Sequence, residues 1–599
     1  MSKKKESQQQ ETSWSNRILD LIGDKLTDRA ISRNKANRRK TRQYLDEINP
    51  DSCLILLNKI LRQLLDRTKD VDSIFKSNVM TDRSGKRVWN RDSFDRFLQA
   101  RLNVNAAVTA SIPILWRAFC TAAFFPFSLQ SNDPRIDIND FRRAFAFVVT
   151  RGYELLGAMS DGSTSDWKDS RDSYAENVPR LTRIIFRSLS VPRLQSGTQS
   201  RASHRTLQLQ DIKDTIAFTQ PIMAEDFSIK TPREAAEEWE AAAQRVLLAD
   251  HEQSQPSGLP ITVNKANLQD VIQLFFLQCV EDRRWRAGLD FHSFQRSGDI
   301  MYSHSSSDPE EILRASRLAS AFTAYQFPGS EDYVTWEQFE VCCIERPYFV
   351  FAFFQLWATL FTSTTAMQAL RAEEDLTLSI STTNILSFLN VAYMVSGRRS
   401  NDRYHANELG LQLDLQSAML VANVNSTPEL KAEELHSIIA EQNKFHMVFI
   451  WGEDLNAEGK SLSRLIVAFT SPPEEEMWRR IEGKRFVQYV WQTSMVQLEP
   501  YIAVADSGGM SASVAGQAIE LRSHRMSGKN GTSIRVNLTK RVVNVEEFAT
   551  GPAGNAGNET AVDSPKAWST LVMRLMGLKF YRMPGDSAKV TRSGGEKGF

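Results

Sequence analysis

A run of basic residues near the start of this 599-residue chain could bind anionic groups. Six positive charges fall within ten residues, at Arg33, Lys35, Arg38, Arg39, Lys40 and Arg42. Such clusters bind the phosphates of anionic lipids or nucleic acid, or act as nuclear localisation signals, whereas the plainest interpretation is a solvated arm or helix face. The run is therefore a candidate contact for an anionic surface.

A second stretch imitates a nucleotide-binding motif. Residues 452–461 read GEDLNAEGKS and end in Gly-Lys-Ser, as a phosphate-binding loop does. That motif needs its first glycine at position 454, where Asp454 stands and would repel phosphate. We interpret the stretch as a loop between two strands.

The histidines form no recognisable catalytic motif. The sequence contains neither H-E-x-x-H nor G-x-S-x-G. His436 lies two residues after Glu434, and His446 opens an expected strand. Both positions are typical of surface or packing residues, because closeness in sequence supplies no catalytic geometry. We name no catalytic residue, no cofactor and no metal ligand.

The cysteines suit neither a disulfide framework nor a zinc site. There are five, widely scattered: Cys53, Cys120, Cys279, Cys342 and Cys343. No C-x-x-C occurs, so we expect reduced and mostly buried thiols. The adjacent pair lies among apolar neighbours in an expected helix, which keeps thiols protonated and inert.

Charge and composition indicate a globular protein with no global attraction to nucleic acid or membrane. The chain has 73 basic and 72 acidic residues, and we expect no nucleic-acid partner. Its start, MSKKKESQQQETS, lacks the apolar run of a secretory signal, which predicts a cytoplasmic protein. The length and the 42% hydrophobic content suit two to four domains.

Changes in sequence texture divide the chain into segments. Leucines at three- and four-residue spacing in LILLNKILRQLLDR begin a helical lobe. Between residues 160 and 260, polar residues dominate and leave little apolar surface to offset ordering entropy. We expect a basic, disordered arm at 1–50, a helical lobe at 51–159, a largely polar linker with short helices at 160–260, a second helical lobe at 261–369, an α+β domain at 370–585 and a tail at 586–599.

Each helical lobe contains the outline of an EF-hand, a calcium-binding helix–loop–helix. A calcium loop needs a carboxylate at position one, glycine at six and a bidentate Glu at twelve. These positions hold Leu129, Pro134 and Asp140 in the loop around Ile136, and Phe327, Asp332 and Gln338 in the loop around Val334. We therefore expect degenerate EF-hand loops that bind no calcium.

Residues 347–370 carry no charge and are long enough to span a membrane as a helix. Gln355 and the segment TSTTAMQ lower the hydropathy of this stretch. A helix buried between two packed lobes is the alternative, and both interpretations stay open.

Strand-like segments dominate the chain after residue 370. They combine β-branched and aromatic residues with turn residues between them. They are SAMLVANV, KFHMVFIW, RLIVAF, KRFVQYVWQ, QAIELR, TSIRVNLT, KRVVNVEEF and MGLKFYRM. Two helical stretches, NILSFLNVAYMV and PELKAEELHSIIAEQ, accompany them. We therefore expect an α+β fold that ends in a β-sandwich flanked by helices.

These segments resemble the TLDc-domain family, and within it the two-part restriction of telomere capping proteins. The resemblance lies in VWNRDSFDRFLQ, AAFFPF and IDINDFRRAFAFVVTRGYELL, then in VTWEQFEVCCIERPYFVFAFFQLWATLF, which resembles the approach to the TLDc domain. SAMLVANV, HMVFIWGEDL, KRFVQYVWQTSMVQLEP and MGLKFYRM follow that domain's strand order. The chain departs from the family at SGRRSNDR, where Arg-Asp-Gly is common, and at Ser2, where close relatives carry a myristoylated glycine.

The resemblance implies a non-enzymatic regulator that docks on the vacuolar proton-pumping ATPase, with links to oxidation resistance and telomere capping. Such a protein would be cytoplasmic, or peripheral at the vacuolar or lysosomal membrane. Two alternatives stay open. One is a membrane-surface scaffold that uses the basic run, and the other is an enzyme with an unrecognised site, such as a redox site.

Overall fold

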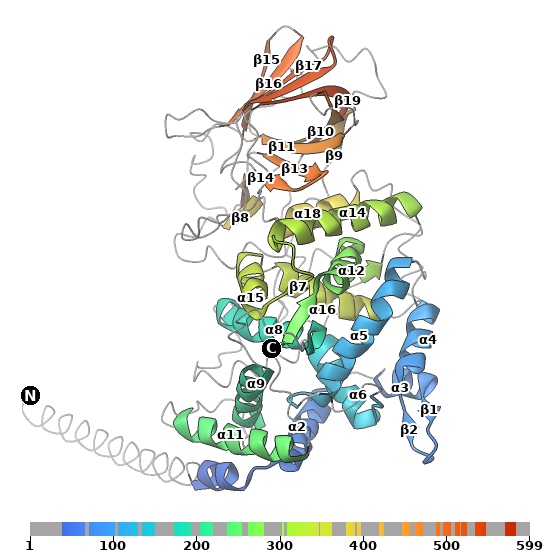
Figure 1. Cartoon of the computed structure of the whole chain (residues 1–599), viewed down its shortest axis with the longest axis vertical. Helices are drawn as coiled ribbons and strands as arrows, with labels where there is room; N and C mark the ends of the chain where they lie inside the picture. Colours follow the sequence, from blue (N-terminus) through green and yellow to red (C-terminus); the bar gives the residue numbers. More distant parts are fainter. Residues whose placement is uncertain are drawn as a thin grey trace, which may run out of the picture.

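The structure, a computed structural model, describes residues 39–65, 71–101, 106–127, 129, 134–149, 173–192, 204–219, 236–253, 261–280, 302–304, 308–346, 348–361, 379–389, 392–396, 419–423, 446–455, 462–470, 487–491, 495–504, 510–515, 517–523, 533–546 and 570–582. Within these residues the fold mixes α and β structure, with helices in the N-terminal part and most strands in the C-terminal part (Figure 1). The expected α+β class is confirmed at this level.

The helical part begins with a helix over residues 39–47. The elements that follow are α2 (Pro50–Leu65), α3 (Val71–Asn78), α4 (Arg91–Arg101), α5 (Ala106–Phe124), α6 (Ile138–Ala144), the π-helix η1 (Phe145–Val149), α8 (Ser173–Leu189), α9 (His204–Thr219), α11 (Ala236–Gln253), α12 (Lys265–Phe276), α14 (Pro309–Gln326), α15 (Trp336–Glu345), α16 (Tyr348–Phe361) and α18 (Ile380–Phe388).

Backbone pairing joins the loops between these helices two by two. Trp89 and Ile136 exchange two backbone hydrogen bonds of 2.9 and 3.0 Å, and Val263 lies opposite Val334. The short strands of this part are β1 (Met80–Thr81), β2 (Arg87–Val88), β3 (Val191–Pro192), β4 (Ile261–Asn264), β5 (Gln278–Val280), β6 (Tyr302–His304) and β7 (Tyr333–Val334). The two expected loops therefore belong to two separate pairs, each with a partner loop that the sequence analysis missed.

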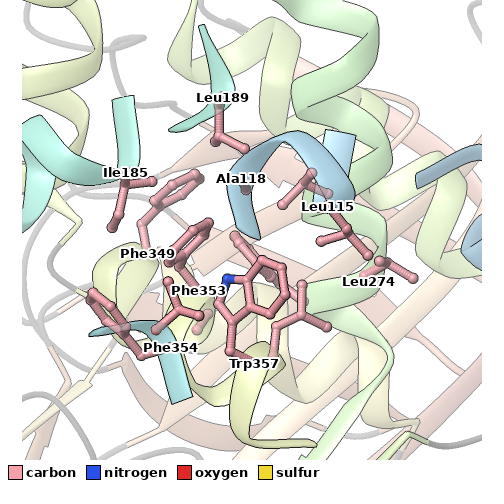
Figure 2. Close-up of a cluster of buried hydrophobic side chains, with 14 of the residues drawn as sticks. Leu115, Ala118, Ile185, Leu189, Leu274, Phe349, Phe353, Phe354 and Trp357 are labelled. Atoms are coloured by element: carbon pink, nitrogen blue, oxygen red, sulfur yellow. The ribbon is translucent and has the colours of Figure 1, made fainter. Parts of the chain in front are cut away.

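One hydrophobic core runs through both expected helical lobes, and α16 lies inside it. Trp357 has no exposed surface, and its ring centroid lies 5.7 Å from that of Phe119 on α5. Figure 2 shows this cluster, with Ile185 from α8 and Leu274 from α12 around the aromatic rings of α16. The uncharged stretch is therefore a buried helix up to Phe361, while residues 362–370 lie outside the described part.

A second core belongs to a four-helix bundle made of the helix at 39–47, α2, α9 and α11. Its buried residues include Tyr44, Ile216, Trp239 and Val246. In Figure 1 this bundle lies at the end of the molecule farthest from the large sheet. Residues 39–50 are thus folded where a disordered arm was expected, and the expected linker contributes helices to both cores.

A buried cluster of charges joins α8 and α9, which lie in the segment expected to be a largely polar linker with short helices. Arg183 of α8 donates to Asp211 and Asp214 of α9 at 2.5 Å each. Arg187 also donates to Asp211, and to the carbonyl oxygen of Pro126 at 3.3 Å. Both aspartates are almost fully buried. Polar composition here reflects an internal ion network, because charges survive burial only when they are paired.

The C-terminal part is built around a ten-stranded sheet, the curled sheet. Its strands are β9 (Met419–Asn423), β10 (His446–Asp454), β11 (Ser463–Thr470), β13 (Met495–Glu499), β14 (Ala503–Val504), β15 (Met510–Ala515), β16 (Ala518–Ser523), β17 (Ser533–Asn537), β18 (Val542–Glu546) and β19 (Thr570–Arg582). The strand order is β10-β19-β18-β17-β16-β15-β11-β13-β14, with β9 beside β19. Because β10 also pairs with β11, seven of these strands form a closed circuit.

Alternation along the strands gives the curled sheet two buried faces. Val448 and Ile450 of β10 point into a core enclosed by the circuit, whereas Met447 and Phe449 belong to the helical core. The same division holds along β11 and β13. The sheet therefore rests on the helices through one face and shares their core.

All eight segments expected to be strands contain strands. One of them pairs outside the curled sheet, and one expected helix ends earlier than predicted. The segment KRFVQYVWQ gives β12 (Val487–Trp491), which pairs with β8 (Ala392–Ser396) in a separate two-stranded sheet. The stretch expected as one helix, residues 384–395, instead ends its helix at Phe388 and continues as β8. The expected helix at 428–442 lies outside the described residues.

Candidate interaction surfaces

The structure places half of the basic run on a folded helix. Arg39, Lys40 and Arg42 are exposed on the helix at 39–47, while Arg33, Lys35 and Arg38 lie outside the described residues. The opposite face of this helix is buried in the four-helix bundle. The spacing of the buried residues fixes this orientation, because Thr41, Tyr44, Leu45 and Ile48 lie on one face of the helix.

Specific hydrogen bonds hold the basic helix on the bundle. The Tyr44 hydroxyl shares a hydrogen bond of 2.6 Å with the Thr219 hydroxyl at the end of α9. Arg245 of α11 donates to the carbonyl oxygen of Leu45 at 2.7 Å. Burial raises the pKa of Tyr44 well above its usual value, so the hydroxyl stays protonated and able to donate. The three bases are therefore presented from a fixed support.

Two exposed aliphatic side chains accompany these bases on the bundle. Ile55 of α2 is 66% exposed and lies one helical turn before Lys59, which is also exposed. Leu248 of α11 is 50% exposed and lies three residues after Arg245. The sequence analysis missed these four residues, because α2 and α11 are about two hundred positions apart along the chain. We call the set Arg39, Lys40, Arg42, Ile55, Lys59, Arg245 and Leu248 the basal surface.

The paired loops use their carboxylates to hold their own backbone. Asp82 accepts backbone hydrogen bonds from Ser84 and Lys86 at 2.8 and 2.9 Å. Asp137 and Asp140 form a reciprocal capping box at the start of α6. Within the described residues there is no group of three or more His, Cys, Asp or Glu side chains that could hold a metal.

The loop around Val334 is closed in the same way. The hydroxyl of Thr335 accepts the backbone N–H of Gln338, and the Gln338 side chain accepts the backbone N–H of Thr335. The twelfth loop position therefore caps α15 instead of facing a cation site. Lys265 donates to the carbonyl oxygen of Gly329 at 3.0 Å, which places an ammonium where calcium coordination would need oxygen ligands.

The stretch that imitates a phosphate-binding loop connects β10 to β11, as its strand-connecting interpretation predicts. Asp454 accepts from Arg464 at 2.5 Å, and Arg464 also donates to the side chain of Gln497 at 2.9 Å. These groups are largely buried beside the enclosed core. Asp454 is thus engaged in closing the end of the sheet, while residues 456–461 lie outside the described part.

Four cysteine side chains and His446 are buried. The cysteines are Cys53, Cys120, Cys342 and Cys343, whose burial agrees with expectation, and the side chain of Cys279 is not described. Burial raises the pKa of Cys53 and of Cys343 to about 12. Such thiols stay protonated at neutral pH. His446 is buried in β10, and His436 lies outside the described residues.

Polar groups lie at α14, a helix that contacts β13 of the curled sheet. Tyr581 of β19 is buried there, and this burial raises its pKa to about 12, although the charge of Arg314 on α14 acts in the opposite direction. Glu311, three residues earlier on α14, accepts the Ser381 backbone N–H at 2.7 Å and the Ser379 hydroxyl at 3.0 Å. These bonds cap α18 and fix it against α14.

Comparison with protein-family models, with curated proteins and with solved structures gave no match. Among the helices that the structure describes, none combines the length and apolar character needed to cross a bilayer.

Proposed function

We propose that this chain is a non-enzymatic adaptor of TLDc type that binds the vacuolar proton-pumping ATPase and alters its assembly. The observation that carries the proposal is the order of the parts. Two pairs of helix–loop–helix units come first, and a curled sheet with its own core follows and rests on them. This order agrees with the two-part organisation that the sequence resemblance implies.

We infer that the paired loops are degenerate EF-hands. Helices flank each loop, and the two loops of a pair meet through an antiparallel bridge at Trp89 and Ile136, or at Val263 and Val334. Capping bonds and Lys265 occupy the places of cation ligands. In this interpretation the helical part is a rigid support whose loops have exchanged calcium for internal hydrogen bonds.

We infer that the curled sheet is a divergent TLDc domain and carries the contact with the pump. Exposed large aliphatic side chains mark its outer surface: Leu455 at the end of β10 is 48% exposed and Met576 of β19 is 50% exposed. Exposed apolar side chains are candidates for the centre of a protein interface. A link to oxidation resistance or telomere capping would then follow from the pump contact or from a further partner.

The test is affinity purification of the tagged full-length chain from its own cells, without crosslinker, followed by mass spectrometry. The proposal predicts enrichment of proton-pump subunits. It also predicts that Leu455→Asp combined with Met576→Asp reduces this enrichment. The matched control is Val341→Asp combined with Ile344→Asp, which changes two equally exposed aliphatic residues on α15 of the helical part.

The outcomes separate the parts of the proposal. Pump subunits that are not enriched with the unaltered chain would overturn the adaptor function. Equal loss of pump subunits in the two double variants would remove the curled sheet as the contact. Retention by the control and loss by the sheet variant would support both inferences.

A further inference from the structure

We propose that the basal surface is a contact for an anionic lipid bilayer. This contact is independent of the pump and lies on the four-helix bundle, away from the curled sheet. The inference rests on three features of the described residues: bases on a fixed support, exposed aliphatic side chains one helical turn from two further bases, and the position of the bundle in the molecule.

The first feature is the rigid presentation of the bases. Arg39, Lys40 and Arg42 project from a helix whose other face is buried in the bundle core. Residues that stay ordered before binding lose less conformational entropy on binding than residues of a free arm. The sequence that precedes this helix contains the remaining bases of the run, so positive charge continues beyond the described part. Clusters of this size are typical of contacts with anionic headgroups.

The second feature is the pairing of bases with exposed aliphatic residues. Ile55 shares a helix face with Lys59, and Leu248 shares one with Arg245. At a bilayer, bases meet lipid phosphates while aliphatic side chains enter the boundary between headgroups and acyl chains. Binding to a soluble polyanion gives no reason to expose Ile55 and Leu248, whereas binding to a bilayer does.

Acidic residues interrupt this surface. Asp46, Glu47 and Asp51 are exposed and lie between Arg42 and Ile55 in the sequence, with Asp51 one helical turn before Ile55. The positive charge is therefore concentrated at the start of the helix at 39–47. This distribution favours a contact that is oriented, in which the first turn of that helix faces the membrane.

The third feature is the place of the basal surface in the molecule. The four-helix bundle and the curled sheet lie at opposite ends of the long axis in Figure 1. A bilayer bound to the bundle would leave the sheet directed away from the membrane. Membrane binding and protein binding at the sheet could then occur together without competing for surface.

The experiment measures binding of the purified full-length protein to vesicles, with no pump present. Vesicles of phosphatidylcholine alone are compared with vesicles that contain about a quarter phosphatidylserine. We expect binding only to the anionic vesicles, and weaker binding at high salt. The variant Arg39→Glu with Lys40→Glu and Arg42→Glu should bind about a hundredfold more weakly, since each base near an anionic surface contributes about fivefold.

A matched variant controls for net charge. Arg317→Glu with Lys540→Glu and Arg574→Glu reverses three exposed bases outside the bundle and should bind like the unaltered chain. Ile55→Ser with Leu248→Ser should weaken vesicle binding while leaving retention on heparin unchanged. Circular dichroism checks that each variant is folded.

Three results would overturn the proposal. They are equal binding to neutral and anionic vesicles, equal losses in the two charge-reversal variants, and vesicle binding that ignores the replacement of Ile55 and Leu248. The last result would make the basal surface a general polyanion site. Because the assay contains no pump subunits, its failure leaves the proposed adaptor function untouched.

Discussion

The four-helix bundle and the curled sheet bury their interiors by different means. The sheet encloses apolar side chains from alternate positions, such as Leu521 of β16 and Ile534 of β17, which face each other across two neighbouring strands. The helices next to the bundle core instead share a network of Arg183, Asp211 and Asp214. The sheet buries its ion pair of Asp454 and Arg464 at the end of two strands, whereas the helices carry matched charges in their interior.

The comparison shows that a polar helix can be a structural element. α9 buries Asp211, Asp214 and Thr215 together with Ile212 and Ile216. Paired buried charges add less stability than their strength suggests, because desolvation offsets attraction, but removing one partner is costly. The bundle should therefore be more sensitive to single charge removals than the sheet is.

The largest expected effect is that of Asp211→Ala. This change leaves Arg183 and Arg187 buried without their shared carboxylate, so the free energy of unfolding should fall by about 3–5 kcal/mol. Urea unfolding followed by tryptophan fluorescence measures the loss. The control is Lys213→Ala on the same helix, whose partly exposed pair with Glu240 contributes less than about 1 kcal/mol. Equal losses in the two variants would contradict an internal role for Asp211.

The next effect concerns the apolar interior of the curled sheet. Leu521→Ala removes a fully buried side chain from the enclosed core and should lower the free energy of unfolding by about 3 kcal/mol. The neighbouring Glu520→Ala breaks only partly exposed ion pairs, with Arg522 at 2.9 Å and Arg535 at 3.5 Å. If Glu520→Ala lowered the free energy of unfolding as much as Leu521→Ala does, the stability of β16 would depend on charge as well as on apolar burial.

A smaller effect is expected where β10 passes closest to β19. A Cβ atom at Gly452 would lie 2.2 Å from the carbonyl oxygen of Arg574, so Gly452→Ala forces the two strands apart. We expect a loss of about 1–3 kcal/mol, as for other overpacked sites. Ser463→Ala, which changes an exposed residue of β11 beside β10, is the control. An unchanged melting temperature for Gly452→Ala would contradict the observed register of β10 and β19.

The smallest effect tests an ion pair at the surface. Arg142 donates to both carboxylate oxygens of Asp72, and these hydrogen bonds hold the pKa of Asp72 below its ordinary value of 3.8. When a carboxyl has a lower pKa in the folded protein, its charge stabilises the fold at pH values above the ordinary pKa. This stabilisation is lost as the pH falls through the lowered pKa. Asp72→Asn should therefore lower the free energy of unfolding by less than about 1 kcal/mol at neutral pH, and not at all at a pH below the lowered pKa of Asp72.

Thermal melts of the unaltered protein and of Asp72→Asn measure this difference. They run from neutral pH to a pH below the lowered pKa of Asp72. Asp46→Asn, which changes another exposed carboxylate, is the matched control. A cost of Asp72→Asn that stays constant down to the lowest pH would show that the charge of Asp72 is not the cause.

The sequence predicts the sheet better than the bundle, for a local reason. In β17 and β18 the alternation of buried and exposed residues occurs within five positions, so a short window contains the whole signal. The bundle unites residues 39–56 with residues 204–219 and 236–253, and its helices carry interior charges. Neither the distant partners nor the pairing of Asp211 with Arg183 can be read from composition.

The residues of the basal surface also fall into those that the sequence predicts and those that only the fold brings together. Arg39, Lys40 and Arg42 were predicted because they are consecutive or nearly so. Ile55 and Leu248 could not be predicted, since only the fold brings α2 and α11 into one bundle. The partner loops around Trp89 and Val263 were also missed. The loop around Trp89 has the carboxylate of Asp82 at position one but Arg87 at six and Ser93 at twelve, and the loop around Val263 has no calcium-loop residue at any of these three positions.

Helix α9, from a segment expected to be a largely polar linker, is an integral part of the fold. Hydrogen exchange of the full-length protein, followed by mass spectrometry, measures this directly. Backbone amides of residues 208–218 in α9 should exchange as slowly as those of β16 in the curled sheet. Exchange of the α9 amides within seconds, while β16 stays protected, would contradict the claim and return this segment to the role of a linker.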